Sequence, residues 1–125
     1  MDDDPGVIRG LWRVLRRARP EYQVNTASGA LPAIKALSEL SYDVVITDLQ
    51  MPGGGGRAVL NTLVALYPKT GRIVHSSQLE SSDPSQIRKL AHVVLAKPAT
   101  ESEIIDAIEA SLQRVASSRP PARSG

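Results

Sequence analysis

The clearest signal of the fold in this chain is the stretch YDVVITDLQMP, residues 42–52. Its centre is the β-branched run VVIT at 44–47, which is followed at once by Asp48. A short continuous run of this kind is typical of a parallel strand that is buried on both faces of a sheet. We therefore predict a central strand over 42–47, with Asp48 at its carboxyl end and a glycine-rich loop after it.

The rest of the chain alternates between helical and strand patterns. We predict helices over 5–19, 28–40, 57–67, 81–90 and 100–116, and strands over 22–26, 42–47, 71–75 and 93–95. Asp4 followed by proline predicts the start of the first helix, and TESE at 100–103 fits a capping box for the last. The alternation predicts an α/β fold, a doubly wound parallel sheet with helices on both faces. In such sheets, binding sites lie beyond the carboxyl ends of the strands.

Composition excludes several classes of protein. The 125 residues include no cysteine, which excludes disulfides, zinc–thiolate sites and thiol catalysis. No apolar run reaches the ~20 residues of a membrane span, and the acidic start MDDDP does not fit a signal peptide. The arginines of the first predicted helix are interpreted as a solvated face, and no aromatic platform for nucleic acid accompanies them. We expect a cytoplasmic protein that binds neither membranes nor nucleic acids directly.

Polar side chains that suit phosphoryl transfer lie at the predicted strand ends. Asp48, Ser76 and Lys97 each end a strand, and Asp2 and Asp3 stand at the start of the chain. Carboxylates bind a hard cation such as Mg²⁺, and one of them can form an aspartyl phosphate. A lysine and the cation can then neutralise the phosphoryl oxygens. The plainer alternatives are that Asp48 only ends a strand and that the acidic start only caps a helix.

Four segments together resemble the receiver domain of two-component response regulators. They are DDDP at 2–5, YDVVITDLQMP at 42–52, RIVHS at 72–76 and AKP at 96–98, in the order that the family has them. The resemblance extends over most of the chain. It implies a flavodoxin-like fold with the strand order 2-1-3-4-5.

The resemblance also implies a phosphate-accepting site. Asp48 would accept a phosphoryl group from a sensor histidine kinase or a phosphotransfer protein. Asp2, Asp3 and Asp48 would hold Mg²⁺ together with the backbone carbonyl of Gln50, and Asp4 would be left as a helix cap.

Three further residues take roles from the resemblance. Ser76 would be the switch hydroxyl that moves toward the phosphoryl group, and Lys97 would pair with that group. Pro98 is a candidate for a cis peptide bond, which is far less costly before proline than before other residues. The two histidines, His75 and His92, are interpreted as structural.

The chain departs from the family pattern in three places. Only Met1 precedes Asp2, so the first strand is missing or truncated, and the acidic pair would sit on an unanchored terminus. We expect that the natural reading frame starts upstream or that the chain is truncated; the alternative is a strand borrowed from a partner. Val94 stands where many receivers carry an aromatic switch residue, and Gly55 replaces a polar loop residue.

These observations favour a phosphorylation-dependent signalling receiver over 1–116, followed by a disordered basic tail over 117–125. Its output would be contact with an unknown downstream protein, and a homodimer is an alternative left open. We do not expect an enzyme. The second hypothesis is a pseudo-receiver that binds proteins without phosphorylation. A phosphatase of the haloacid-dehalogenase type is disfavoured because Gln50 stands where a general acid is needed.

Overall fold

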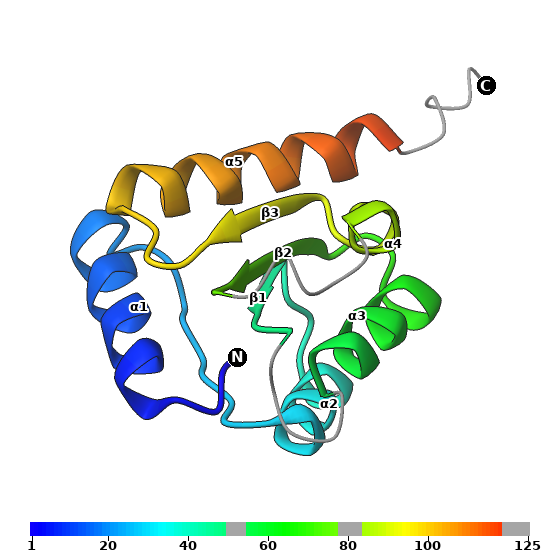
Figure 1. The fold of residues 1–125 in the computed structure, drawn as a ribbon, viewed down its shortest axis with the longest axis horizontal. Coiled ribbons are helices and arrows are strands. Elements are labelled where there is room, and N and C mark those ends of the chain that lie inside the picture. The colour runs from blue at the N-terminus through cyan, green and yellow to red at the C-terminus, as the bar shows by residue number, and fades with distance from the viewer. Residues whose placement is uncertain (50–54, 78–83, 119–125) are drawn as a thin grey trace.

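A three-stranded parallel sheet with the order β1-β2-β3 forms the centre of the molecule (Figure 1). The computed structural model describes residues 1–49, 55–77 and 84–118. In chain order, the elements are α1 (Pro5–Ala18), α2 (Ala30–Glu39), β1 (Val44–Thr47), α3 (Gly55–Leu66), β2 (Gly71–Ser76), α4 (Pro84–Leu90), β3 (Val93–Ala96) and α5 (Glu101–Ser118).

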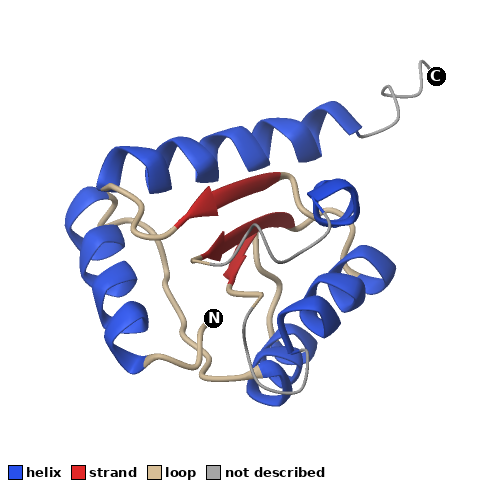
Figure 2. Ribbon diagram, viewed as in Figure 1, coloured by secondary structure: helices blue, strands red, loops and turns tan. Residues whose placement is uncertain are grey.

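Helices cover both faces of the sheet (Figure 2). α1 and α5 pack against one face, where Leu15 and Ile108 form a buried cluster with Ile73 of β2. α2 and α3 cover the opposite face at β1, where Leu63 packs near Val45, and α4 extends this layer beside β2. Within the described ranges, none of these helices has the length and apolar character needed to cross a membrane.

The register of the sheet brings the predicted site residues to one edge. Thr47 of β1 lies opposite Val74 of β2, and Ser76 at the end of β2 lies opposite Ala96 of β3. The carboxyl ends of parallel strands share one edge, so Asp48 and Lys97 follow their strands at the same side of the molecule. The predicted α/β fold is confirmed in this respect.

Both predicted helix starts have the expected capping bonds. The Gly6 N–H donates to Oδ1 of Asp4 at 2.8 Å, before a proline at the first helical position. At the start of α5, the Glu103 N–H donates to Oγ1 of Thr100 at 3.1 Å, and the Thr100 N–H donates to Oε1 of Glu103 at 2.9 Å. These bonds satisfy amide groups that have no partner inside the helix.

The predicted strand over 22–26 is wrong. These residues form no strand in the described part of the chain, and β1 is therefore an edge strand of the sheet. A strand needs a neighbour to receive its backbone hydrogen bonds, and no strand of the described chain lies between this segment and β1. The observed order corresponds to the last three strands of the order 2-1-3-4-5.

Several predicted boundaries also differ from the structure by one or two residues, among them those of α3 and α5. α3 begins at Gly55, so Gly55 and Gly56 belong to a helix and not to the preceding loop, whose residues 50–54 lie outside the described ranges. α5 continues to Ser118, two residues past the boundary that we predict at 116. The residues from 119 onward are not described, so the disordered tail stays a prediction.

Leu63 and Leu66 of α3 allow a matched test of the core. Leu63 is fully buried, whereas Leu66 is 67% exposed on the same helix. Replacing Leu63 with alanine should lower the free energy of unfolding by about 2–5 kcal/mol, because a cavity remains in the packed layer. Leu66→Ala should change it by less than ~0.5 kcal/mol. Urea unfolding followed by circular dichroism measures both, and equal losses would contradict this packing.

Candidate functional site

Asp48 lies directly after β1 and is only 5% exposed. Its backbone N–H donates to the carbonyl of Met1 at 3.0 Å, and the hydroxyl of Thr47 donates to its carbonyl at 3.1 Å. These hydrogen bonds fix the backbone of Asp48 and therefore the place from which its carboxylate extends. A carboxylate with so little contact with water needs a positive partner.

That partner is Lys97, which follows β3. Its Nζ lies 2.8 Å from Oδ2 of Asp48 and 2.7 Å from Oδ2 of Asp2. Asp2 is 2% exposed, so both carboxylates are buried and both form an ion pair with the same ammonium group. We call Asp2, Asp3 and Asp48 the carboxylate cluster.

The two carboxylates keep Lys97 protonated. Burial alone would lower the pKa of Lys97, but hydrogen bonds and charge attraction from Asp2 and Asp48 outweigh it and raise this pKa above its ordinary value. The site therefore holds a fixed positive charge beside Asp48 at neutral pH. A negatively charged group bound to Asp48 would lie next to this ammonium and would be stabilised by its positive charge.

The carboxylate cluster has the donor set of a site for a hard cation. One carboxylate oxygen from each of Asp2, Asp3 and Asp48 lies within 4.8 Å of the other two. Oxygen ligands from carboxylates suit Mg²⁺ and Ca²⁺ rather than softer metals. The fourth predicted ligand, the carbonyl of Gln50, lies outside the described residues.

The start of the chain is anchored, contrary to our expectation. The terminal ammonium of Met1 donates to the carbonyl of Ile46 at 2.6 Å. The Asp2 N–H donates to the carbonyl of Ala27 at 3.3 Å, and Oδ1 of Asp2 accepts the Asp4 N–H at 2.9 Å. Burial lowers the pKa of the Met1 ammonium, although the charges of Asp2 and Asp48 oppose this. Asp2 is thus held by hydrogen bonds at both its backbone N–H and its side chain.

Ser76 and Lys97 connect the ends of β2 and β3. Ser76 is fully buried, and its carbonyl accepts the Lys97 N–H at 3.0 Å. The following Lys97–Pro98 peptide bond is cis, which is the isomer that the resemblance implies. The structure therefore brings together Asp2, Asp3, Asp48 and Lys97, with Ser76 on the strand between β1 and β3.

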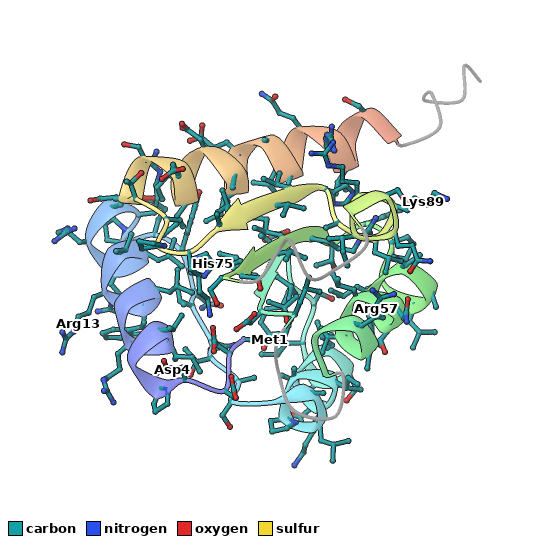
Figure 3. The ribbon with its side chains drawn as sticks, in the orientation of Figure 1. Met1, Asp4, Arg13, Arg57, His75 and Lys89 are labelled. Carbon is teal, nitrogen blue, oxygen red and sulfur yellow. The ribbon has the colours of Figure 1, made fainter. Side chains whose placement is uncertain are left out.

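Both histidines lie inside the protein framework. Nδ1 of His92 accepts the Arg72 N–H at 2.9 Å, which joins the start of β3 to β2. His75 is buried in β2, and its Nε2 has no hydrogen-bond partner within the described chain (Figure 3). Burial and then the charge of Lys97 lower the pKa of His75. Burial, with Arg72 and Arg114, likewise lowers the pKa of His92.

Gly56 is a site residue that the sequence analysis missed. A Cβ atom on Gly56 would overlap the carbonyl oxygen of Asp48 and would lie 2.7 Å from Cα of Leu49. The first turn of α3 therefore touches the backbone of Asp48, which only a residue without a side chain allows. The glycine run after Asp48 was the available signal, but four successive glycines do not reveal which one is in contact.

Gly56→Ala should push α3 away from Asp48. We expect a loss of about 1–3 kcal/mol in the free energy of unfolding, because backbone atoms cannot move aside as a flexible side chain can. Gly10→Ala on α1 is the matched control, since a Cβ there has nothing within 4 Å. That change should stabilise the protein by about 0.5–1 kcal/mol through helix propensity. Losses of similar size in both variants would contradict the contact at Gly56.

The lowered histidine pKa values predict acid sensitivity. The folded protein binds these protons less readily than the unfolded chain does, so stability should fall as the pH drops through 6.5, the ordinary value for histidine. Thermal unfolding between pH 7.5 and pH 5.5 measures this. His75→Gln should flatten part of the slope, and His75→Gln with His92→Gln should flatten it further. Equal slopes in wild type and double variant would refute the assignment.

Comparisons with known proteins agree with this geometry. The family model described as "Response regulator receiver domain" matches residues 1–109. The transcriptional regulatory protein KdpE of Mycobacterium tuberculosis is 35% identical over 115 residues, which cover 91% of this chain and 50% of that protein. A protein-glutamate methylesterase/protein-glutamine glutaminase of Agrobacterium fabrum is 33% identical over 84 residues, covering 66% of this chain and 24% of that protein. The chain thus spans half or less of these relatives.

Solved structures show the same fold. A response regulator receiver domain protein from Clostridium thermocellum superimposes with a TM-score of 0.80 at 25% identity, covering 90% of each chain. A CheY-like receiver domain protein from Methanospirillum hungatei has a TM-score of 0.80 at 19% identity and covers 94% of each chain. With the carboxylate cluster and Lys97 at the strand ends, and a family match over residues 1–109, this chain belongs to the response regulator receiver domain family.

Proposed function

We propose that this chain is a phosphorylation-dependent signalling receiver in which Asp48 accepts the phosphoryl group. The observation that carries the proposal is the buried Asp48 carboxylate, 2.8 Å from the Lys97 ammonium and beside Asp2 at the edge of a parallel sheet. The donor would be a sensor histidine kinase or a phosphotransfer protein, both of which carry phosphate on a histidine nitrogen. The proposed location is the cytoplasm, with no membrane or nucleic-acid partner.

The proposed reaction is a simple transfer. A carboxylate oxygen of Asp48 forms the new O–P bond while the N–P bond of the donor phosphohistidine breaks, and the donor imidazole keeps the bonding electron pair. Asp2, Asp3 and Asp48 would hold Mg²⁺, which supplies positive charge to the phosphoryl oxygens. Lys97 already pairs with the Asp48 carboxylate, and it would keep its partner as the negative charge moves onto the phosphoryl group.

Ser76 would respond to the negative charge of the phosphoryl group on Asp48. Ser76 is a buried residue of β2, the strand between β1 and β3. Its hydroxyl would donate a hydrogen bond to a phosphoryl oxygen. Val94 packs with the cluster of Leu60, Val74 and Ile87 between β2, α3 and α4. An aliphatic side chain in this position would transmit the change through packing, not through rotation of an aromatic ring. The output would be a contact with a downstream protein, and turnover would be limited to the protein's own phosphorylation and hydrolysis.

A second candidate is a pseudo-receiver that binds a partner without phosphorylation. Lys97 bridges Asp2 and Asp48 directly, so each of these buried carboxylates has a cationic partner without a phosphoryl group. In that case the site would serve stability, and Asp48→Asn would leave partner binding unchanged.

Acetyl phosphate with Mg²⁺ tests the proposal. Wild type should gain the mass of one phosphoryl group in intact-protein mass spectrometry, in a bond that survives acid and is cleaved by hydroxylamine. Asp48→Asn should show no gain. Asp43→Asn is the matched control, because Asp43 is an exposed carboxylate just before the same strand. Removing Mg²⁺ with EDTA should abolish the gain in both wild type and control.

Equal labelling of wild type and Asp48→Asn would overturn Asp48 as the acceptor. No labelling of a folded wild type, with partner binding retained by Asp48→Asn, would favour the pseudo-receiver.

A further inference from the structure

Two arginines and a histidine gather at the amino ends of β2 and β3. Arg72 is the second residue of β2, His92 directly precedes β3, and Arg114 lies in the second half of α5. Ser76 and Lys97, which belong to the site described above, are at the other ends of the same two strands. Arg72 and Ser76 are four positions apart along β2, or ~13 Å. This group is therefore distinct from the carboxylate cluster.

His92 is hydrogen-bonded to both arginines. Its Nδ1 accepts the backbone N–H of Arg72 at 2.9 Å, and its carbonyl accepts a hydrogen bond from Nη1 of Arg114 at 2.6 Å. Burial and then the charges of Arg72 and Arg114 lower the pKa of His92, so both guanidinium groups lie near its ring. Because Nδ1 is an acceptor, the neutral imidazole carries its proton on Nε2, which is then a donor. We call Arg72, His92 and Arg114 the Arg–His–Arg trio.

Both guanidinium groups donate only to carbonyl oxygens within the described chain. Nε of Arg72 donates to the carbonyl of Leu90 at 2.6 Å, and its Nη1 donates to that of Pro68 at 3.4 Å. Burial lowers the pKa of Arg72, so this guanidinium has lost water without gaining a carboxylate. Arg114 likewise forms no ion pair in the part of the chain that the structure describes. Each guanidinium has five N–H donors, so both arginines can still bind an anion from outside.

The segments that meet at the trio carry basic residues and no acidic ones. No aspartate or glutamate occurs in residues 61–76, 84–100 and 110–118. The last acidic residue of α5 is Glu109, and Asp43 stands before β1 at the same end of the sheet, but neither pairs with an arginine of the trio among the described residues. Lys89 in the last turn of α4 adds positive charge, on the side of the molecule opposite Arg13 (Figure 3). This end of the molecule therefore attracts anions.

We propose that the Arg–His–Arg trio is a binding site for the phosphate group of a phosphate monoester. The N–H groups of a guanidinium form a fork that matches two oxygens of such a group, and Nε2 of His92 adds a further donor. Two arginine charges also match the ~2 negative charges that a monoester carries at neutral pH.

A bound phosphate would connect three parts of the chain, because the donors come from β2, from the residue before β3 and from α5. A phosphorylated small molecule and a phosphorylated side chain of a partner protein share the chemistry that the trio would recognise. The proposal does not depend on phosphorylation of Asp48, which lies at the opposite ends of the strands.

Inorganic phosphate in the presence of EDTA is the probe for this site. Without a divalent cation, the carboxylate cluster should repel phosphate, because Lys97 is already paired with two carboxylates. At pH 7.5 and an ionic strength held constant with NaCl, the amide NMR signals of Arg72 and His92 should shift and saturate, with a Kd on the order of 1–10 mM. Shifts that do not saturate, or shifts equally large at Arg13, would overturn the proposal.

Arg114→Gln removes one guanidinium from the site. Arg114 is exposed on α5, so the variant should remain folded. Its affinity for phosphate should fall roughly 5-fold or more, because a charge-assisted hydrogen bond is lost. Arg13→Gln is the matched control, since it makes the same change of net charge at an exposed arginine of α1, and it should bind phosphate as wild type does. Equal weakening in the two variants would mean that net charge alone attracts phosphate and would refute the site.

Other anions distinguish the sources of the phosphate group. Glycerol phosphate and O-phosphoserine should bind as inorganic phosphate does. Tighter binding of a capped peptide that contains phosphoserine would support a phosphorylated partner protein as the source, and equal affinities would support a small molecule. Dimethyl phosphate, a monoanionic diester, should bind more weakly than the monoesters. Equal affinity for acetate and phosphate, or tighter binding of a single-stranded oligonucleotide without terminal phosphates to the same signals, would overturn recognition of a monoester.

Discussion

The ammonium of Lys97, held between the carboxylates of Asp2 and Asp48, is the interaction on which the rest of the site depends. It joins the start of the chain, the end of β1 and the end of β3. Removing the ammonium would leave two buried carboxylates without their shared cation, and such a loss is costly. The same charges that hold the strand ends together also suit a phosphoryl group and a hard cation. The charged atoms of Asp2, Asp48 and Lys97 therefore contribute both to the stability of the fold and to the chemistry of the site.

A second constraint is the open edge of β1. A parallel sheet is stable when both faces and both edges of its central strands are covered. Here side chains of α1, α2 and α5 line a cavity beside β1, and residues 22–26 form no strand in the described chain. Met1 and Asp2 bridge the gap at one end only. Asp2 and Asp48 of the carboxylate cluster are consequently held by the backbone hydrogen bonds of Met1 and Asp2.

Most of the fold could be predicted from local patterns, whereas part of the site could not. The VVIT run, the capping residues around Asp4 and Thr100, and the helical spacing of apolar residues act within a few positions of one another, so they can be read from the chain directly. The segment over 22–26 has the alternation of a strand but forms none, because a strand depends on a neighbour that local pattern does not supply. Gly56 was missed for a similar reason, since its contact with Asp48 exists only after α3 folds back.

Local sequence patterns predict the eight observed elements and the position of Asp48 at the end of a buried strand, because periodicity and capping are local properties, but they also predict a strand over 22–26 that does not form. Tertiary structure alone decided that Lys97 pairs with Asp2, 95 positions away, and that one ammonium serves two carboxylates. It also decided that Met1 enters the ladder of β1 beside an apolar cavity. These features depend on the register of strands far apart in the chain, which is set by how the two helical layers pack and not by any neighbouring residue.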